Sequence, residues 1–183
     1  MTEGRLVIQA GAKTDFFRNT DVVSETGITP ESLSNAPFLY KEVAGDFVMR
    51  VKVSHEFLDT YDAACIMVMR DLDVWAKACF EQTDFDTHAV VSVVTDHTSD
   101  DANGSNIDGN TVWMQLTRVK NSFSFHYSVD GEHFFMMRFF SLPVGETVKV
   151  GLLAQAPTGQ GGARTYERFS LEQRTVKNIR MGN

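Results

Sequence analysis

The chain is poor in cysteine, with only Cys65 and Cys79 among 183 residues. The two form no CxxC pair and have no spacing that would suit a zinc site. Both stand inside apolar runs, which favours free buried thiols, although a disulfide between neighbouring strands stays open. A chain of this length buries enough surface to fold without covalent cross-links. Because the sequence also lacks clustered metal ligands and phosphate-loop motifs, we expect neither a metal nor a cofactor.

Basic residues are also scarce, since 17 Lys and Arg stand against 24 Asp and Glu, giving a net charge of -7. The resulting field repels phosphate groups, and we therefore expect no nucleic-acid partner. No run of about 18 apolar residues occurs, and the opening MTEGRLVIQAGAKTDFF lacks the basic and apolar regions of a signal peptide. These absences predict no membrane association and a cytoplasmic location.

Helical periodicity is missing as well, because no stretch longer than about ten residues keeps a 3.6-residue period. Instead, short runs of β-branched and aromatic residues alternate with Gly, Asp, Asn, Pro and Ser. They predict an all-β sandwich or barrel, which we expect to form one domain over residues 1–183. The runs are LVIQA, DFVMRVKVS, AACIMVMR, WAKACFEQ, HAVVSVVT, TVWMQLTRV, SFSFHYSV, HFFMMRFF, TVKVGLLAQ and YERFSLEQ.

Two neighbouring runs differ in how they distribute polar residues. AACIMVM is apolar at both alternating positions, which predicts a central strand covered on both faces. In WAKACFE, the residues Trp75, Lys77 and Glu81 share one face, opposite a face of small and aromatic residues. An indole beside a cation and a carboxylate suits a sugar or small polar ligand, while a solvated sheet face stays open.

Three further segments carry expectations about turns and surfaces. Asp130-Gly131 between SFSFHYS and HFFMMRFF predicts a hairpin. The polar stretch 95–110 predicts a long exposed loop. HFFMMRFF favours a central strand covered on both sides, although an exposed apolar patch for a partner stays open.

The four acidic residues of the 95–110 stretch raise the question of calcium. Their oxygens would suit Ca²⁺, but the spacing is not that of an EF-hand, so a solvated acidic segment is favoured. These residues are Asp96, Asp100, Asp101 and Asp108.

Known catalytic signatures are missing too. The chain has no GxSxG elbow, no GxGxxG or GxxxxGK phosphate loop and no ExDxxE pair of carboxylates. The five histidines are scattered without metal-ligand spacing. We therefore favour a protein that is not an enzyme, with no catalytic residue assigned.

Several blocks together resemble the YesU-like family, which includes regulator-of-enolase-like proteins and is poorly characterised. The blocks are TDFF at 14–17, GDF at 45–47, YDAACIM at 61–67, WAKACFE at 75–81 and SVDG at 128–131. The resemblance implies a concanavalin A-like jelly roll of two curved antiparallel sheets, with a ligand on the concave face. Phe17, Ala63, Cys65 and Cys79 depart from the family pattern, and these changes would reshape a pocket.

The resemblance also implies which side chains meet a ligand, because Tyr61, Asp62, Trp75, Lys77 and Glu81 match recurring polar and aromatic positions of the family. We add two residues of other strands, Trp113 and His126, as candidates. The favoured hypothesis is noncatalytic binding of a carbohydrate or other small polar ligand on the concave sheet face. Two alternatives stay open: a saccharide-active enzyme using Glu81 with Asp62, and a regulatory protein that binds a protein partner or a second copy.

Overall fold

The computed structural model of the chain describes residues 4–19 and 33–183. Every regular element in these two ranges is a β-strand, and no helix there is long and apolar enough to cross a membrane. The strands are β1 (Arg5–Gly11), β2 (Phe16–Phe17), β3 (Leu33–Ser34), β4 (Phe38–Ala44), β5 (Phe47–His55), β6 (Ala63–Met69), β7 (Val74–Gln82), β8 (His88–Asp96), β9 (Thr98–Asn106), β10 (Thr111–Val119), β11 (Ser122–Ser128), β12 (Phe135–Ser141), β13 (Thr147–Gln155) and β14 (Gly161–Glu172).

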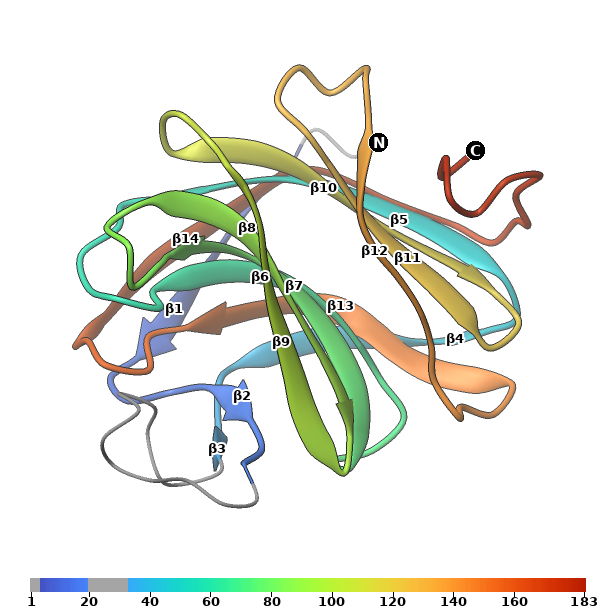
Figure 1. The fold of residues 1–183 in the computed structure, drawn as a ribbon, viewed down its shortest axis with the longest axis horizontal. Coiled ribbons are helices and arrows are strands. Elements are labelled where there is room, and N and C mark those ends of the chain that lie inside the picture. The colour runs from blue at the N-terminus through green and yellow to red at the C-terminus, as the bar shows by residue number, and fades with distance from the viewer. Residues whose placement is uncertain (1–3, 20–32) are drawn as a thin grey trace.

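The long strands form two six-stranded antiparallel sheets that pack face to face (Figure 1). The order β4-β13-β6-β7-β8-β9 defines what we call the β6 sheet, and β1-β14-β5-β10-β11-β12 defines the β10 sheet. The chain crosses repeatedly between the sheets, since β4 and β13 lie in one while the strands that follow them, β5 and β14, lie in the other. This arrangement confirms the predicted all-β jelly-roll sandwich.

The main core lies between the two sheets and is built from alternating positions of each strand. Ala76, Ala78 and Phe80 of β7 face inward, toward Met114 and Phe125 of the opposite sheet. All of β6 is buried on both faces, which confirms the prediction of a central strand for this run. A second apolar cluster covers the outer face of the β6 sheet, and that cluster positions the candidate site.

The β11–β12 hairpin forms as predicted around Asp130-Gly131. The two strands pair antiparallel, with an irregularity in register between Phe125 and His126. Gly131 has a φ of 80°, a conformation that glycine adopts at little cost, and a Cβ at this position would lie 2.8 Å from the Trp113 ring. The turn is longer than a two-residue connection, because β11 ends at Ser128 and β12 begins at Phe135.

The prediction of a long exposed loop over residues 95–110 is wrong, because residues 98–106 form β9 at the edge of the β6 sheet. An edge strand needs hydrogen bonds along one side only, and nearly all side chains of β9 are exposed. This stretch therefore forms a strand without the apolar alternation by which strands are recognised. Its pairing with β8, from Ala89↔Asn106 to Asp96↔Thr98, supplies the hydrogen bonds.

The prediction that HFFMMRFF is a central strand covered on both sides is also wrong. β12 is the outermost strand of the β10 sheet, and Phe135 and Phe139 are 56% and 42% exposed. Among the described strands, β11 is the one that pairs with it. A high apolar content alone therefore did not distinguish a covered strand from an edge strand.

Candidate functional site

The N-terminal segment crosses the outer face of the β6 sheet, the face that points away from the main core. Thr14 forms a β-bridge with Ala156, and Phe16 contacts the Trp75 ring edge-on, with 5.8 Å between ring centroids. Trp75 is fully buried, and its indole N–H donates to the Leu72 carbonyl at 3.2 Å. The predicted ligand-binding indole therefore packs beneath the N-terminal segment and does not line the pocket described next.

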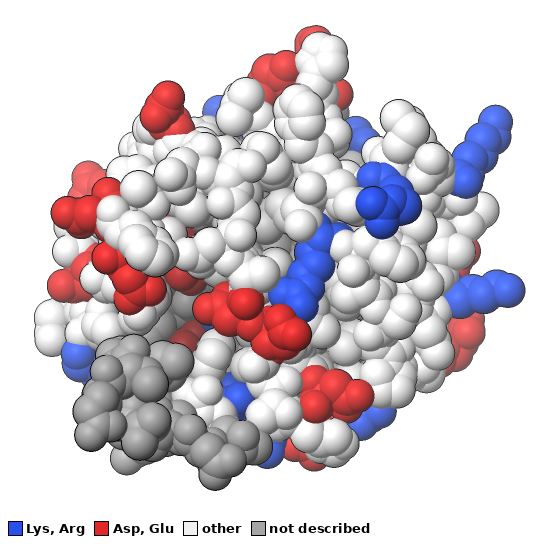
Figure 2. Space-filling view, viewed as in Figure 1, with Lys and Arg blue, Asp and Glu red and all other residues white. Residues whose placement is uncertain are grey.

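A pocket of about 260 Å³ opens beside this contact. Its floor comes from outward-facing residues of four strands, and its walls come from the N-terminal segment and from loops. Acidic side chains gather around a hollow on this face of the molecule (Figure 2). The lining residues are Lys77 and Glu81 of β7, Val93 of β8, Asp101 of β9, Gln155 of β13, Asp15, Phe17, Tyr61, Asp84 and Pro157.

A buried glutamine, Gln155, connects the polar groups of the pocket floor. Its amide nitrogen donates to the Tyr61 carbonyl at 3.2 Å and to the Glu81 carboxylate at 3.4 Å. Its amide oxygen accepts from Lys77 Nζ at 2.6 Å and from Cys65 Sγ at 3.7 Å. These bonds fix the amide in one orientation, in which the oxygen of Gln155 contacts Lys77 and the nitrogen contacts Glu81.

Lys77 is almost fully buried and carries its charge into the pocket. Its ammonium lies 2.7 Å from Asp15 Oδ1, and the Asp15 backbone N–H is in turn held by Asn35 Oδ1 at 2.9 Å. Burial is the largest single effect and disfavours the charged ammonium. Attraction to Asp15, its hydrogen bond and the effects of the nearby Cys79 and Cys65 together outweigh burial, so the pKa of Lys77 is raised above its ordinary value. Lys77 is therefore a permanent cation that is already paired.

Glu81 lies in the same pocket and differs from Lys77 in its charge state. Burial raises the pKa of Glu81 well above its ordinary value of 4.5, and the nearby Lys77 offsets only part of that effect. Displacement of solvent likewise raises the pKa of Asp101 at the pocket rim. The raised pKa favours the neutral carboxylic acid at Glu81, which can both donate and accept a hydrogen bond.

Tyr61 and Asp84 form the mouth of the pocket, where both are accessible to solvent. The Tyr61 hydroxyl donates to the Asp84 carboxylate, and the Tyr61 backbone N–H donates to the Gln82 carbonyl at 2.7 Å. Tyr61 has a φ of 68°, an uncommon conformation for a residue with a side chain. Burial and the hydrogen bond to Asp84 raise the pKa of Tyr61, so that its hydroxyl stays protonated.

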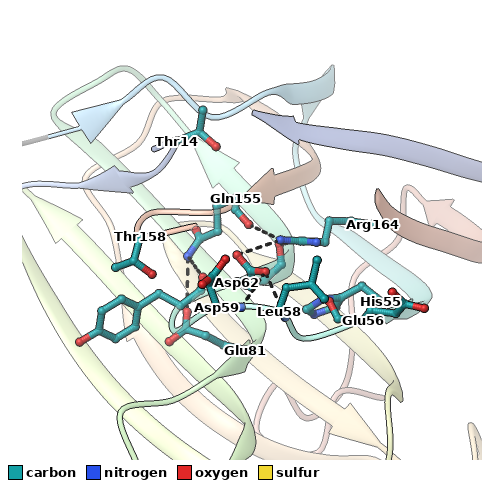
Figure 3. Close-up of polar contacts among 12 residues, drawn as sticks. Thr14, His55, Glu56, Leu58, Asp59, Asp62, Glu81, Gln155, Thr158 and Arg164 are labelled. Atoms are coloured by element: carbon teal, nitrogen blue, oxygen red, sulfur yellow. Dashed lines mark hydrogen bonds and ion pairs between the residues drawn. The ribbon is translucent and has the colours of Figure 1, made fainter. Parts of the chain in front are cut away.

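Asp62 is not brought to the pocket, although it follows Tyr61 directly. Its carboxylate is fully buried, lies 3.2 Å from the Arg164 guanidinium, and accepts from the backbone N–H of Asp59 at 3.3 Å. Arg164 also donates to the Gln155 carbonyl at 2.9 Å, so this ion pair lies behind the pocket floor (Figure 3). Burial raises the pKa of Asp62 while Arg164 opposes the rise.

The remaining two candidates lie on the other sheet. Trp113 of β10 and His126 of β11 are on the outer face of the β10 sheet, since the adjoining Met114 and Phe125 point into the main core. His126 is fully buried and donates from Nε2 to the Arg180 carbonyl at 3.0 Å. The seven sequence candidates therefore divide, with Tyr61, Lys77 and Glu81 together in one pocket.

The cysteines lie beside the pocket floor rather than in it. Cys65 and Cys79 face each other across β6 and β7, both thiols are buried and free, and their sulfur atoms are 3.2 Å apart. This confirms the prediction of free buried thiols. Burial raises the pKa of Cys79 well above its ordinary value, which disfavours the reactive thiolate.

A metal site does not emerge from the acidic residues of β9 and its flanks. Asp101 faces the pocket, whereas Asp100 forms an ion pair with Arg138 at 2.8 Å. Within residues 4–19 and 33–183, no group of three or more His, Cys, Asp or Glu side chains is placed to hold a metal ion.

Sequence reasoning missed two residues that organise the pocket, Asp15 and Gln155. Gln155 is the polar end of the apolar run TVKVGLLAQ, and a polar residue there was a usable signal. Asp15 lies in the TDFF block of the family resemblance, but its contact with Lys77, 62 positions away, depends on the path of the N-terminal segment.

A second, larger cleft of about 360 Å³ opens between the edge strands β1 and β4. Its lining is mostly apolar and includes Leu6, Leu39 and Leu152. It lacks the converging buried polar groups of the first pocket, so we do not assign the candidate site to it.

Solved structures with a similar fold include a protein of unknown function and proteins whose names refer to saccharides. A functionally unknown protein from Saccharomyces cerevisiae aligns with a TM-score of 0.81 and 28% identity, over 96% of this chain and 91% of that chain. A Bacteroides ovatus protein described as xyloglucan PUL GH43B aligns with a TM-score of 0.72 and 14% identity, over 93% of this chain and 33% of that chain. An alginate lyase from Klebsiella pneumoniae aligns with a TM-score of 0.56 and 10% identity, over 72% of this chain and 61% of that chain.

At identities of 10–14%, the last two likenesses concern the fold, and this chain spans only about a third of the Bacteroides protein. No curated protein matches the chain. Residues 1–174 match the model of one family, described as a protein of unknown function, DUF1349. The chain therefore belongs to the DUF1349 family.

Proposed function

We propose that this chain is a noncatalytic binding protein for a neutral, hydroxyl-rich carbohydrate or a similar small polar ligand, held in the pocket of Tyr61, Lys77 and Glu81. The carrying observation is the buried network Lys77–Gln155–Glu81, which presents fixed hydrogen-bonding groups at the floor of a pocket of about 260 Å³. Phe17, Tyr61 and Pro157 add the apolar walls on which a sugar ring packs.

Charge narrows the ligand class. Among the described residues that line the pocket, Lys77 is the one cation, and it is already paired with Asp15. Two further Asp side chains, Asp84 and Asp101, stand at the mouth and the rim. An anionic sugar would meet this negative field, so we propose that neutral sugars bind in preference to uronic acids.

The fold neighbours support a carbohydrate without identifying it. The xyloglucan PUL GH43B protein and the alginate lyase have names that refer to saccharides. We also propose that the nearer relatives within the family are the YesU-like proteins, on the sequence blocks described above. A cytoplasmic location and a homodimer or protein partner stay predictions.

The test is thermal unfolding in the presence of a panel of neutral mono- and oligosaccharides and the matching uronic acids. A ligand at 100 times its Kd stabilises the folded protein by about 2.7 kcal/mol, which a shift in Tm reveals readily. We expect stabilisation by a neutral member of the panel and none by its uronic acid. Stabilisation by the uronic acids alone would contradict the proposed charge selection.

A matched pair of variants tests the location of the site. Asp101→Ala removes a pocket carboxylate, whereas Asp100→Ala makes the same charge change at the adjacent residue, whose side chain pairs with Arg138. Hydrogen bonds to charged groups contribute about 1.5–3 kcal/mol, so Asp101→Ala should weaken binding by about tenfold or more. Equal effects from the two variants would place the ligand elsewhere.

One observation favours a second candidate, a saccharide-active enzyme. Burial keeps Glu81 protonated at higher pH than an ordinary carboxyl, which is the property of a general acid. Asp62 is buried against Arg164, so a partner carboxylate would come from Asp84 or Asp101. If the panel contains a substrate, Glu81→Gln should reduce its turnover by about 100-fold or more, and unchanged turnover would exclude this role.

A further inference from the structure

The edge strands β1 and β4 lie on the same side of the sandwich and close it along only part of its length. Ala10 of β1 packs with Ala154 of β13 and with Ala156 just after it. These small side chains let the two sheets approach closely at that end. Toward Leu6, at the other end of β1, the space between the sheets stays open and forms the cleft of about 360 Å³. We call it the edge cleft.

The edge cleft exposes side chains from positions that the strand period assigns to the main core. Leu39 shares its face of β4 with the core residue Val43, and Leu6 shares its face of β1 with Ile8, which packs against the core. Leu39 is nevertheless 55% exposed and Leu6 is 38% exposed. Covering apolar side chains of this kind with an apolar ligand removes them from water, which is favourable.

A β-bulge in β14 adds an aromatic wall to the edge cleft. The pairing of β14 with β5 shifts register between Glu167 and Ser170, and Arg168 within this shift has a φ of 55°. The extra residue puts Phe169 on the same side as Tyr166, whereas strict alternation would turn the two to opposite sides. Both rings therefore line the cleft.

The charged residues that line the edge cleft are all cations, Arg5 and Lys41. This differs from the chain as a whole, in which 24 acidic residues outnumber 17 basic ones. Glu167 lies opposite Arg5 in the β1–β14 pairing but does not line the cleft. Neither cation forms an ion pair with a residue in the described ranges. Cations beside apolar walls are complementary to an anion that carries an apolar tail.

The opposite side of the sandwich shows how two edge strands are joined by the chain itself. There, Arg138 of β12 donates to Asp100 Oδ1 of β9 at 2.8 Å, and the Tyr127 hydroxyl donates to Ser105 Oγ at 2.8 Å. Within residues 4–19 and 33–183, β1 and β4 are not paired with each other. The side with the edge cleft is therefore the open side of the sandwich.

Charge and shape favour a small ligand over a second copy of the chain or a membrane. In a two-fold dimer the same patch meets itself, so Arg5 and Lys41 of the two copies would repel one another. A bilayer surface is broad, whereas the innermost walls of the cleft, Val150 and Leu152, are buried between the strands. The cleft volume of about 360 Å³ lies near the lower end of the range for small-molecule sites, about 300–1,000 Å³.

We propose that the edge cleft binds a free medium-chain fatty acid in its anionic form. The alkyl chain lies against Leu6, Leu39 and Phe169, and the carboxylate lies within reach of Arg5 and Lys41. The proposal is independent of the carbohydrate pocket, because the two linings share no residue.

Isothermal titration calorimetry with sodium octanoate and sodium decanoate, below the concentrations at which they form micelles, tests the apolar part of the site. Each buried CH₂ group raises the affinity about fourfold, so decanoate should bind about 15-fold more tightly than octanoate. Decyltrimethylammonium has the same tail length and the opposite charge, and should bind about fivefold more weakly than decanoate or less. The proposal is overturned if affinity does not rise with chain length, or if the cationic amphiphile binds as tightly as decanoate.

Matched variants test the location. Leu39→Ser should weaken decanoate binding about fivefold, because it removes an apolar wall, whereas Leu72→Ser, at a leucine that is 54% exposed and outside the cleft, should not. Lys41→Gln should weaken binding about threefold, and Lys177→Gln, at an exposed lysine outside the cleft, should leave it unchanged. All four side chains are exposed, so unliganded Tm values should stay close to that of the unmodified protein. Equal effects within each pair would place the fatty acid elsewhere and overturn the assignment.

The other two occupants are tested on the same protein. Sedimentation velocity without ligand should show no dimer that Leu39→Ser dissociates, and such a dimer would assign the cleft to a second copy. Co-sedimentation with phosphatidylglycerol vesicles should show no binding. Binding to vesicles without binding of free decanoate would assign the cleft to a membrane surface, and either result would overturn the proposal.

Discussion

Glu81, on the pocket floor, makes the stability of the folded protein depend on pH. The raised pKa of Glu81 means that the folded protein holds a proton there more tightly than the unfolded chain, whose ordinary value is 4.5. The stability from this group is therefore fully present below pH 4.5 and is lost as the pH rises through the higher folded-state pKa. Burial is compatible with the neutral carboxylic acid, whereas ionisation of the buried carboxyl raises the free energy of the folded state.

Glu81→Gln should remove this dependence, because glutamine is neutral at every pH. Above pH 4.5, the free energy of unfolding of the variant should rise relative to the unmodified protein by at most about 1.4 kcal/mol per pH unit. Urea unfolding between pH 4.5 and 7.5 measures the difference. Glu132→Gln, at an exposed position, is the control, and a difference that stays constant with pH for Glu81→Gln would contradict the assigned ionisation.

At the scale of elements, β13 and β4 approach closely at Gly151. A Cβ there would lie 1.9 Å from the Leu39 carbonyl oxygen and 2.7 Å from Tyr40 Cα, both backbone atoms of β4. Because backbone cannot rotate away as a side chain can, Gly151→Ala should push the two strands apart. Overpacking of this kind costs about 1–3 kcal/mol or more in the free energy of unfolding.

The control is Gly145→Ala, since a Cβ at Gly145 would meet no atom within 4 Å. Urea unfolding should show a clear loss of stability for Gly151→Ala and little change for Gly145→Ala. Similar stabilities for the two variants would mean that β4 is not held this tightly against β13.

At the scale of the whole molecule, the Lys77–Asp15 ion pair joins the N-terminal segment to the β6 sheet. Lys77→Met should cost about 3–5 kcal/mol in the free energy of unfolding, because it leaves a carboxylate in a buried site without its cation. Adding Asp15→Asn should recover part of that loss. The exposed pair Arg174–Glu172 is the comparison, where Glu172→Gln should change stability by less than about 1 kcal/mol.

Urea unfolding at pH 7 of the two single variants and the double variant measures the coupling. A double variant that is less stable than Lys77→Met alone would show that Asp15 does not depend on Lys77. Ligand binding provides a second readout, because loosening the segment that carries Asp15 and Phe17 should also weaken the proposed pocket.

Some features of the fold could be predicted from the sequence and others could not. The prediction that AACIMVM is a central strand is confirmed, and so is the prediction that Trp75, Lys77 and Glu81 share one face of their strand. Both follow from residue order, because side chains alternate between the two faces of a strand. β9 and β12 were misread, because an edge strand is defined by the absence of a second neighbour. That absence depends on the order of strands in the sheet and not on the residues of the strand.

By itself, the sequence determined the class of fold, the core positions of the long strands and the pairing of β11 with β12, because local periodicity and turn chemistry carry that information. Only the tertiary structure decided which candidates meet. It buried Trp75 under Phe16, turned Asp62 toward Arg164, and separated His126 onto the other sheet. It also brought Asp15 and Gln155 to Lys77, because a pocket forms from residues distant in the chain and their meeting depends on how the strands cross between the sheets.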